Sequence, residues 1–342
     1  MKTATPAMAR AINDRLALHL LLEHGPLSAP QLRTLTGLSR PTVADLIERL
    51  AANGLVQPCG ETGEEKRGPN ARLYRLVGER AHVAGVDIRR SGTFVTVADL
   101  AGTTVGRAER PASADLAQSI REAVTEAAGG RTLQAAVLGA PGMVHPHTGR
   151  SEGACDLGVS GWDPQVPDRV QESLEVERLV LENEVNLAAV AEHRAGAAQG
   201  REDFVLLWLD EGVGGAVVLG GRVRHGASGG AGEVGFLKLD GDNLCCALTP
   251  AVLPGGPGFD RFAGQVARGA AAMVAVLDPG LVVLGGAAGR TGGTELADAV
   301  SAHLSGLVPA PTEVRATAVD GNPVLQGAVL TALDLARDAV FG

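Results

Sequence analysis

Two short helical patterns separated by a glycine turn, between residues 28 and 52, constrain the fold more than any other feature. Ser28 is placed to cap a helix that runs through Leu35, and Gly37 permits a tight turn. The stretch "SRPTVADLIERLAANGLV" follows, in which Ser39 is placed to cap the next helix and Pro41 sits in its first turn, where no N–H is needed. This spacing is typical of a helix–turn–helix.

The flanking residues extend the pattern. An amphipathic helix is predicted over Ala11–His24, ending at Gly25-Pro26. Within the later helix, the apolar residues fall on one face, which predicts a buried stripe of Val43, Leu46, Ile47 and Leu50. After Leu55-Val56 a polar, basic segment leads to "RLYRL", as in a two-stranded wing. Together these features predict a winged helix–turn–helix over residues 8–78.

Such a domain inserts the start of its second motif helix into the major groove of DNA. The predicted DNA contacts are Ser39, Arg40, Pro41, Thr42, Arg49, Lys66, Arg67, Asn70 and Arg72. Residues 1–80 carry 11 Lys and Arg against 8 Asp and Glu, whereas the rest carries 19 against 31, so only the N-terminal part favours a polyanion. The alternative is a small helical bundle with ordinary surface charges.

Composition excludes several other classes. A chain of 342 residues with 45% hydrophobic residues is long enough for two or three globular domains. No apolar run approaches the ~18 residues of a membrane span, and no signal peptide is evident, so a cytoplasmic location is predicted. The four cysteines, Cys59, Cys155, Cys245 and Cys246, form no CxxC pair, which argues against a disulfide framework or a metal cluster.

The stretch "LENEVNLAAVAE" raises a question about Glu184. An apolar strand leads into a helix through Asn183 and Glu184, at the kind of strand end where α/β proteins hold ligands. Glu184 is then either a catalytic carboxylate or a negative charge that suits the start of a helix. These residues alone leave both interpretations open.

The remaining motifs occur in a recognisable order. They are "VAGVDIRRSGTFVTVADLAGTTV", "AAVLGAPGMVHPHTGR", "GWDP", "LENEVNLAAVAE", "GVGGAVVLGGRVRHGASGGAGEVG" and "LDPGLVVLGG". In this order they resemble the ROK family of repressors and sugar kinases, and with the N-terminal pattern the whole chain resembles a ROK transcriptional regulator.

The resemblance implies an α/β fold: a winged helix–turn–helix followed by a two-lobed, actin-like (ribonuclease H-like) sugar-kinase fold. The expected domains are residues 1–80, which bind DNA, and 81–342, which bind an effector and dimerise. The first lobe would comprise about 81–185 together with a C-terminal helix in "NPVLQGAVLTALDLARDAVF", and the second lobe about 186–320.

The nucleotide side departs from the family pattern. Kinases of the family cradle phosphates with an Asp-Gly-Gly-Thr turn, and this chain has the turn Asp87-Ile88-Arg89-Arg90-Ser91-Gly92. The second phosphate loop, usually Gly-Thr-Gly, is Asp210-Glu211-Gly212. Two carboxylates at that position repel a triphosphate, so ATP binding is not expected.

The sugar side is also altered. The family's catalytic base is the Asp of an Asn-Asp pair, and the matching residue is Glu184, whose extra methylene displaces the carboxylate. The resemblance implies an effector site at Asn183, Glu184, Glu233 and Gly142. The family's following His is Phe236 here.

The family's zinc motif, CxCGxxGCxE, is replaced by "DNLCCALTPAVLPGGPG". No metal and no other cofactor are therefore predicted, and Cys245 and Cys246 are interpreted as small core residues.

The predicted function is a DNA-binding transcriptional regulator, a repressor, with a non-catalytic kinase-like region for dimerisation and small-molecule sensing. A homodimer or tetramer would bind a palindromic operator in double-stranded DNA. Two alternatives stay open: a bifunctional regulator with residual sugar kinase activity, and a scaffold that has lost ligand binding and only assembles the dimer.

Overall fold

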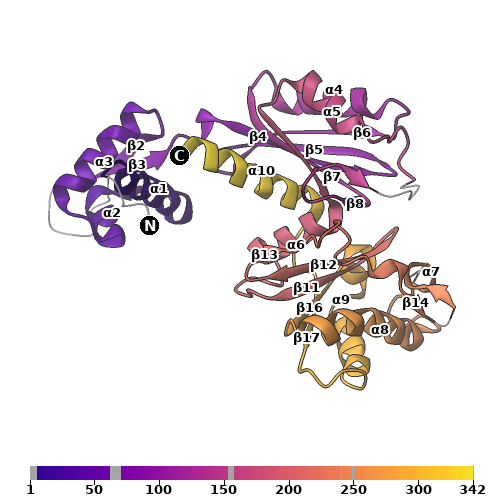
Figure 1. Cartoon of the computed structure of the whole chain (residues 1–342). Coiled ribbons are helices and arrows are strands. Elements are labelled where there is room, and N and C mark those ends of the chain that lie inside the picture. The colour runs from indigo at the N-terminus through magenta and orange to yellow at the C-terminus, as the bar shows by residue number, and fades with distance from the viewer. Residues whose placement is uncertain (1–5, 62–70, 153–157, 240, 249–250, 342) are drawn as a thin grey trace.

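The computed structural model describes residues 6–61, 71–152, 158–239, 241–248 and 251–341. In these residues a small N-terminal domain is followed by two larger lobes, with the C-terminus close to the N-terminal domain (Figure 1). Lys66, Arg67 and Asn70, which are predicted DNA contacts in the wing, lie outside the described residues.

The N-terminal domain is a winged helix–turn–helix, as predicted. Its elements are α1 (Pro6–His24), β1 (Leu27–Ser28), α2 (Ala29–Thr36), α3 (Arg40–Ala52), β2 (Val56–Glu61) and β3 (Arg72–Leu76). The strands form an antiparallel sheet in the order β1-β3-β2. Helix α1 begins at Pro6, five residues before the predicted start at Ala11, because proline is well tolerated in a first helical turn.

The local signals act as the sequence predicts. Ser39 caps α3, since its hydroxyl oxygen accepts a hydrogen bond from the Thr42 backbone N–H at 3.4 Å. Gly37 ends α2 with a φ of +70°, in the left-handed region that glycine adopts without strain. The predicted stripe of α3 is buried: Val43, Leu46, Ile47 and Leu50 are each at most 7% exposed.

Replacing Ser39 with alanine is expected to lower the free energy of unfolding of the N-terminal domain by about 1 kcal/mol. The hydroxyl that satisfies the Thr42 N–H is then lost, whereas Ser39→Asn offers another side-chain oxygen and should retain most of the stability. Urea unfolding of the full chain, followed by helical circular dichroism, measures both variants. Equal stability of the alanine and asparagine variants would contradict the capping role.

The first lobe is built on a five-stranded sheet in the order β10-β7-β4-β5-β6. Its strands are β4 (His82–Arg89), β5 (Gly92–Asp99), β6 (Thr104–Pro111), β7 (Leu133–Ala140) and β10 (Arg178–Asn183), and its outer helices are α4 (Leu116–Ala128) and α5 (Val166–Leu174). Short elements complete it: η1 (Gly78–Arg80), β8 (Met143–Val144) and β9 (Ser151–Glu152). The predicted turn over residues 87–92 is wrong in its extent. Residues 87–89 belong to β4 and pair with β5, which leaves only Arg90-Ser91 as the turn.

The second lobe repeats this plan with a sheet in the order β13-β12-β11-β16-β17. Its strands are β11 (Phe204–Leu209), β12 (Val213–Leu219), β13 (Arg222–Val223), β16 (Leu281–Gly285) and β17 (Glu313–Ala316), and its outer helices are α8 (Phe259–Leu277) and α9 (Gly286–Leu304). The short elements are η2 (Val234–Phe236), β14 (Lys238–Leu239), β15 (Asp242–Asn243) and α7 (Leu244–Ala247).

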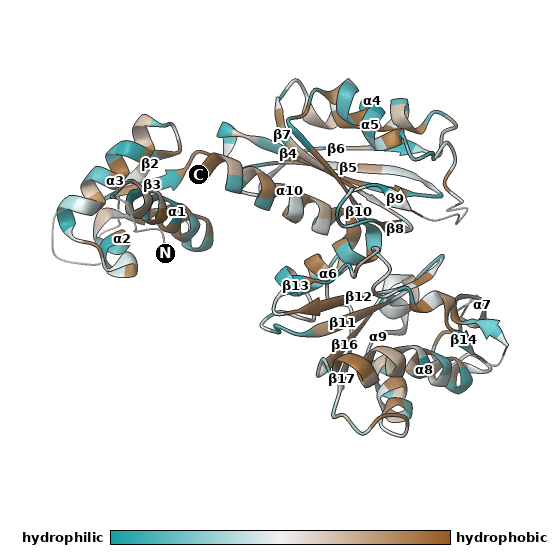
Figure 2. Cartoon of the chain, in the orientation of Figure 1, coloured by the Kyte–Doolittle hydropathy of each residue, from teal (hydrophilic) through white to brown (hydrophobic). Residues whose placement is uncertain are grey.

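Two helices lie between the sheets: α6 (Glu184–Ala195) and α10 (Pro323–Phe341) (Figure 1). The described chain thus has five layers, with apolar strands covered on both faces by helices whose outer sides are polar (Figure 2). The two inner helices cross closely, since a Cβ atom on Gly327 of α10 would lie 1.9 Å from the Leu187 carbonyl oxygen of α6. Both inner helices begin at the cleft between the lobes.

Helix α10 also reaches the N-terminal domain. Asp338 forms an ion pair with Arg15 of α1, and Phe341 packs edge-on against His19 with ring centroids 5.9 Å apart. Because α10 has 19 residues, it spans about 28 Å from the cleft to the winged helix. No helix in the described part of the chain is long and apolar enough to cross a membrane.

Candidate functional site

The cleft between the lobes encloses a cavity of about 150 Å³. Its walls come from the β4–β5 turn, the ends of β7 and β11, and the starts of α6 and α10. The lining residues are Asp87, Ile88, Arg89, Arg90, Ser91, Pro141, Glu184, Trp208, Asp210, Glu211, Gly212 and Val324. Small-molecule sites usually measure ~300–1,000 Å³, so this cavity is smaller than a typical small-molecule site.

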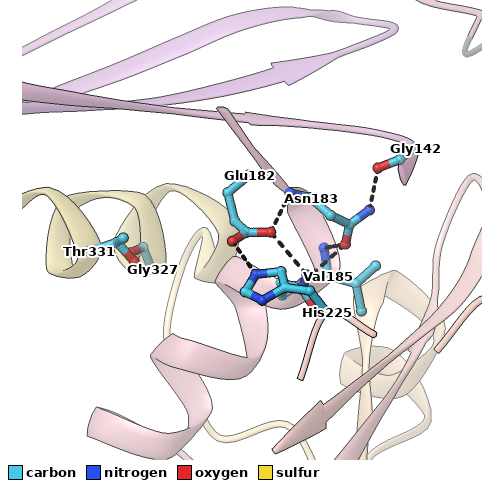
Figure 3. Close-up of polar contacts among 8 residues, drawn as sticks. Gly142, Glu182, Asn183, Val185, His225, Gly327 and Thr331 are labelled. Carbon is cyan, nitrogen blue, oxygen red and sulfur yellow. Dashed lines mark hydrogen bonds and ion pairs between the residues drawn. The ribbon is translucent and has the colours of Figure 1, made fainter. Parts of the chain in front are cut away.

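Three of the predicted effector residues, Gly142, Asn183 and Glu184, lie in one hydrogen-bond network at the start of α6. Figure 3 shows the bond between Asn183 and Gly142. The Asn183 side-chain amide donates to the Gly142 carbonyl at 3.0 Å and to a Glu184 carboxyl oxygen at 2.9 Å. The Asn183 Oδ1 caps the helix, accepting from the Val185 N–H at 2.8 Å and the Asn186 N–H at 3.1 Å. Every polar atom of the Asn183 side chain is therefore engaged.

Glu184 is half-buried, lines the cavity between the lobes and lies near other carboxylates. Burial is the main cause that raises the pKa of Glu184 from 4.5 to about 8, and the negative charges of Glu233, Asp87 and Asp210 add to it. The Glu184 carboxyl group therefore holds a proton at neutral pH. It can donate a hydrogen bond, but it is poorly suited to remove a proton from a hydroxyl group.

Glu233, the fourth predicted effector residue, precedes η2 in the second lobe and is half-buried. Burial raises its pKa as well. Its charge acts on Glu184, so the structure brings Glu233 of the second lobe near the network that joins the other three predicted effector residues.

A hydrogen-bonded pair, Glu182 and His225, joins the two lobes beside this network. The sequence alone provides no indication of this pair. One Glu182 carboxyl oxygen accepts from the Asn183 N–H at 2.8 Å and from the Asn186 side-chain amide at 2.9 Å. The other lies 2.8 Å from His225 Nε2, which comes from the loop after β13 in the second lobe (Figure 3). This hydrogen bond raises the pKa of His225. The pair joins residues 43 positions apart, which local patterns do not connect.

Asp87 is a buried carboxylate near the end of β4. It is 1% exposed and accepts hydrogen bonds from Arg89 Nε at 2.6 Å and from the Asn322 side-chain amide at 2.7 Å. Burial raises the pKa of Asp87, while the positive charge of Arg89 acts in the opposite direction. Asn322 precedes α10 and accepts from the Leu325 N–H at 3.0 Å, so Asp87 fixes the start of that helix.

The position expected for phosphates is occupied by charged protein groups. Arg90 Nε lies 3.8 Å from a Glu211 carboxyl oxygen, across the cleft. Asp210 accepts from the Ala287 N–H at 3.2 Å, at the start of α9. One backbone N–H at the start of α9, of the kind that binds anions, is thus bonded to a carboxylate.

The described DNA-contact candidates divide into two groups. Ser39, Arg40 and Pro41 are exposed at the start of α3, Thr42 lies half-buried beside them, and Arg72 is exposed at the start of β3. Arg49 differs, because it pairs with Asp14 of α1 at 2.6 Å and with Asp45. Its guanidinium group therefore also joins α1 to α3.

The adjacent cysteines are not core residues, contrary to the prediction. Cys246 is exposed and Cys245 is half-buried, because α7 directs Leu244 and, one turn later, Leu248 into the core instead. Among the described residues, no group of three or more His, Cys, Asp or Glu is arranged to hold a metal ion.

Comparison with known proteins agrees with this architecture. Residues 83–248 match the model of the ROK family, and residues 12–67 match a model of the MarR family. The chain is 24% identical over 244 residues to the DNA-binding transcriptional dual regulator NagC of Escherichia coli K12. That alignment covers 68% of this chain and 59% of NagC, so the chain spans under two thirds of this relative.

Solved structures show the same fold. A ROK family transcriptional regulator, a homologue of the E. coli MLC protein, aligns with a TM-score of 0.72 at 15% identity, covering 97% of this chain and 98% of its own. The ROK hexokinase from Thermus thermophilus aligns with a TM-score of 0.61 at 27% identity, covering 75% of this chain and 99% of its own. The predicted fold is confirmed, and the kinase aligns with less of the chain than the regulator does.

Proposed function

The chain is a member of the ROK family that carries a MarR-type winged helix, and we propose that it is a transcriptional repressor whose kinase-like region senses a small molecule without phosphorylating it. One combined observation carries the proposal. The start of α3 is exposed, and in the cleft the Asn183 side chain is hydrogen-bonded within the protein and Glu184, at the position of the catalytic base, is protonated.

The DNA-binding half of the proposal rests on α3. Its first turn presents Ser39, Arg40 and Pro41 to solvent, and the positive end of the helix dipole favours phosphate oxygens. Arg40 is long enough to reach base edges or phosphates from that position. A dimer would present two such helices, which suits a palindromic operator.

The sensing half rests on the cleft and on α10. Asn183, a protonated Glu184 and Glu233 offer hydrogen-bond donors and acceptors of the kind that bind hydroxylated ligands. Val324, in the first turn of α10, lines that cleft, and the last turn of α10 contacts Arg15 and His19 of the winged helix. A ligand that alters the packing at the start of α10 therefore has a direct mechanical route to the DNA-binding domain.

Selection of genomic fragments by the purified full-length protein tests the DNA-binding function. We expect fragments that share a two-fold symmetric site, with half-sites one or more helical turns apart. If the recovered fragments share no common site and their binding is lost in moderate salt, the protein binds DNA only non-specifically, and the proposal is refuted. Thermal-shift screening against sugars then separates a sensor, which one ligand stabilises, from a scaffold, which none stabilises.

We also predict that the protein releases no sugar-dependent ADP when given ATP, Mg²⁺ and a panel of hexoses and amino sugars. Phosphoryl transfer requires a phosphate cradle and a positioned base together, and both are altered. Because Asp210 and Glu211 remain in the nucleotide loop, Glu184→Asp is not expected to restore turnover. Sugar-dependent ADP release that disappears in Glu184→Gln would instead establish the bifunctional alternative.

A further inference from the structure

We infer that a groove between α10 and the β5–β6 edge of the first sheet, the α10 groove, binds an α-amino acid with a large apolar side chain. The α10 groove is separate from the cleft between the lobes, so the inference does not depend on ligand sensing in that cleft.

The α10 groove has a volume of about 930 Å³, within the ~300–1,000 Å³ that is usual for small-molecule sites. Helix α10 packs mainly on β4 and β7 and leaves part of the inner face of β5 and β6 open. The groove thus lies between a helix and the margin of a sheet, where a ligand contacts both.

Strand pairing determines which side chains face the α10 groove. A Cβ atom on Gly85 of β4 would lie 2.7 Å from the Val329 backbone nitrogen, so Gly85 faces α10. Thr96 of β5 pairs with Gly85, and Arg107 of β6 pairs with Thr96. Residues directly opposite each other share a face of the sheet, and so do residues two apart along one strand. Thr96, Arg107 and Glu109 therefore lie on the side of the sheet that α10 covers.

The helical wall and part of the floor are apolar. Leu325, Val329 and Leu333 line the groove at four-residue spacing, so they form one strip along α10. Phe94, two residues before Thr96 on β5, lies on the floor. Phe94, Leu325 and Val329 are only half-buried, so part of this apolar surface is open to water. An apolar side chain of a ligand that covered it would gain free energy from the hydrophobic effect.

Two opposite charges lie next to each other on the sheet wall. Arg107 and Glu109 are exposed, line the groove and are about 7 Å apart along β6. Neither side chain forms a hydrogen bond or an ion pair with any residue that the structure describes. Arg337, the other basic residue of the lining, differs because it donates to the Leu100 carbonyl at 3.0 and 3.1 Å. Arg107 and Glu109 are thus available to a ligand.

Thr96 adds a buried hydroxyl group beside Arg107. Thr96 is 8% exposed and lines the groove, and within the described part of the chain its hydroxyl group makes no hydrogen bond. A buried hydroxyl group without a partner costs free energy, which a hydrogen bond to a ligand recovers. Because Thr96 lies directly opposite Arg107, a carboxylate bound to the guanidinium group is within reach of the hydroxyl group.

Together these groups match a zwitterion attached to an apolar body. An α-amino acid offers a carboxylate to Arg107 and Thr96, an ammonium group to Glu109, and a side chain to the apolar strip on α10. A ligand with only a negative charge fits less well, because Glu109 and Asp320 also line the groove. A sugar fits less well because its hydroxyl groups would face the apolar strip without hydrogen-bond partners.

Isothermal titration calorimetry of the full-length protein with leucine, phenylalanine and tryptophan tests the inference. We expect at least one of them to bind, with one molecule per chain. It should bind about tenfold more tightly than its amide, which lacks the carboxylate, and than its N-acetyl derivative, which lacks the ammonium group. If none of the amino acids binds, or if the two derivatives bind as tightly as the amino acid, the inference is overturned.

Paired variants locate the two charged contacts. Arg107→Gln should weaken binding of the amino acid about tenfold and leave the affinity for its amide unchanged, because the amide lacks the group that Arg107 binds. Glu109→Gln should weaken the amino acid similarly and leave the N-acetyl derivative unchanged. Arg178→Gln is the matched control and should change neither affinity, because Arg178 is exposed on β10, at the opposite edge of the same sheet.

Two further variants distinguish the α10 groove from the cleft. Thr96→Val removes the hydroxyl group with little change of shape and should weaken binding severalfold, whereas Glu184→Gln, in the cleft, should leave binding unchanged. Circular dichroism checks that each variant is folded. Binding that is lost in Glu184→Gln but unaffected by Arg107→Gln would place the amino acid in the cleft. That result would overturn the inference and leave the proposed sensing function intact.

Discussion

Replacement of Arg40 with alanine is expected to weaken binding to the selected operator by about 1–3 kcal/mol, which is roughly 5- to 150-fold, and to relax specificity at the contacted base. Arg40 is the first residue of α3 and is exposed beside the Ser39 cap. A positive side chain at a helix N-terminus contributes little to the fold, so its loss should leave stability almost unchanged. Fluorescence anisotropy at fixed salt measures the affinity.

The wing provides a contrast with this base contact. If Lys66 neutralises a phosphate, Lys66→Ala should weaken binding to all DNA sequences alike and reduce the salt dependence by about one unit. An unchanged operator affinity in the Arg40→Ala/Arg67→Ala double variant would refute the assignment of both α3 and the wing. Arg49→Ala is a poor control, because it also breaks the contact with Asp14 that joins α1 to α3.

The parts of the fold that were predictable from the sequence are those that depend on short-range interactions. The cap at Ser39, the turn at Gly37 and the stripe of α3 each involve residues within a few positions of one another, and the structure contains all three. The lobes depend on long-range pairing. Their motifs became interpretable only through their order and the resemblance to a family.

The wrong or missing predictions also concern residues whose environment depends on long-range contacts. Residues 87–89 were predicted to form a turn because they match the family's Asp-Gly-Gly-Thr turn, but they belong to β4, and Asp87 is buried against Asn322, which lies 235 positions later. The pair of Glu182 and His225 joins two lobes, so neither residue has a local signature. Cys246 is exposed because the direction of α7 depends on where Leu244 packs.

The candidate site shows the same limit. Motif positions alone brought together Gly142, Asn183 and Glu184, which the structure joins by hydrogen bonds. The protonation of Glu184 was not predictable, because it arises from burial between two lobes and from carboxylates on separate elements. The sequence predicted a displaced carboxylate at Glu184, but it did not predict that this carboxyl group is protonated.

This charge state leads to the second large effect, on stability. The pKa of Glu184 is about 8 in the folded protein against 4.5 in an unperturbed chain. Between these pH values the folded protein keeps a proton that the unfolded chain releases. The free energy of unfolding contributed by this group is therefore fully present below pH 4.5 and is lost as the pH rises through 8.

Glu184→Gln removes that dependence, because glutamine stays neutral and has a similar shape. A fully enclosed group with this shift would cost about 5 kcal/mol above pH 8, but Glu184 lines a cavity that water can reach, which reduces the effect. We expect the variant to match the wild type near pH 4 and to be more stable by roughly 1–3 kcal/mol at pH 9. Urea unfolding of both proteins across this pH range measures the difference in their free energies of unfolding. The titration of His225 and Glu233 contributes to both proteins and so largely cancels in this difference. Parallel pH profiles for the two proteins would mean that Glu184 is ionised in the folded state, and a charged carboxylate would then again be available to accept a proton in the cleft.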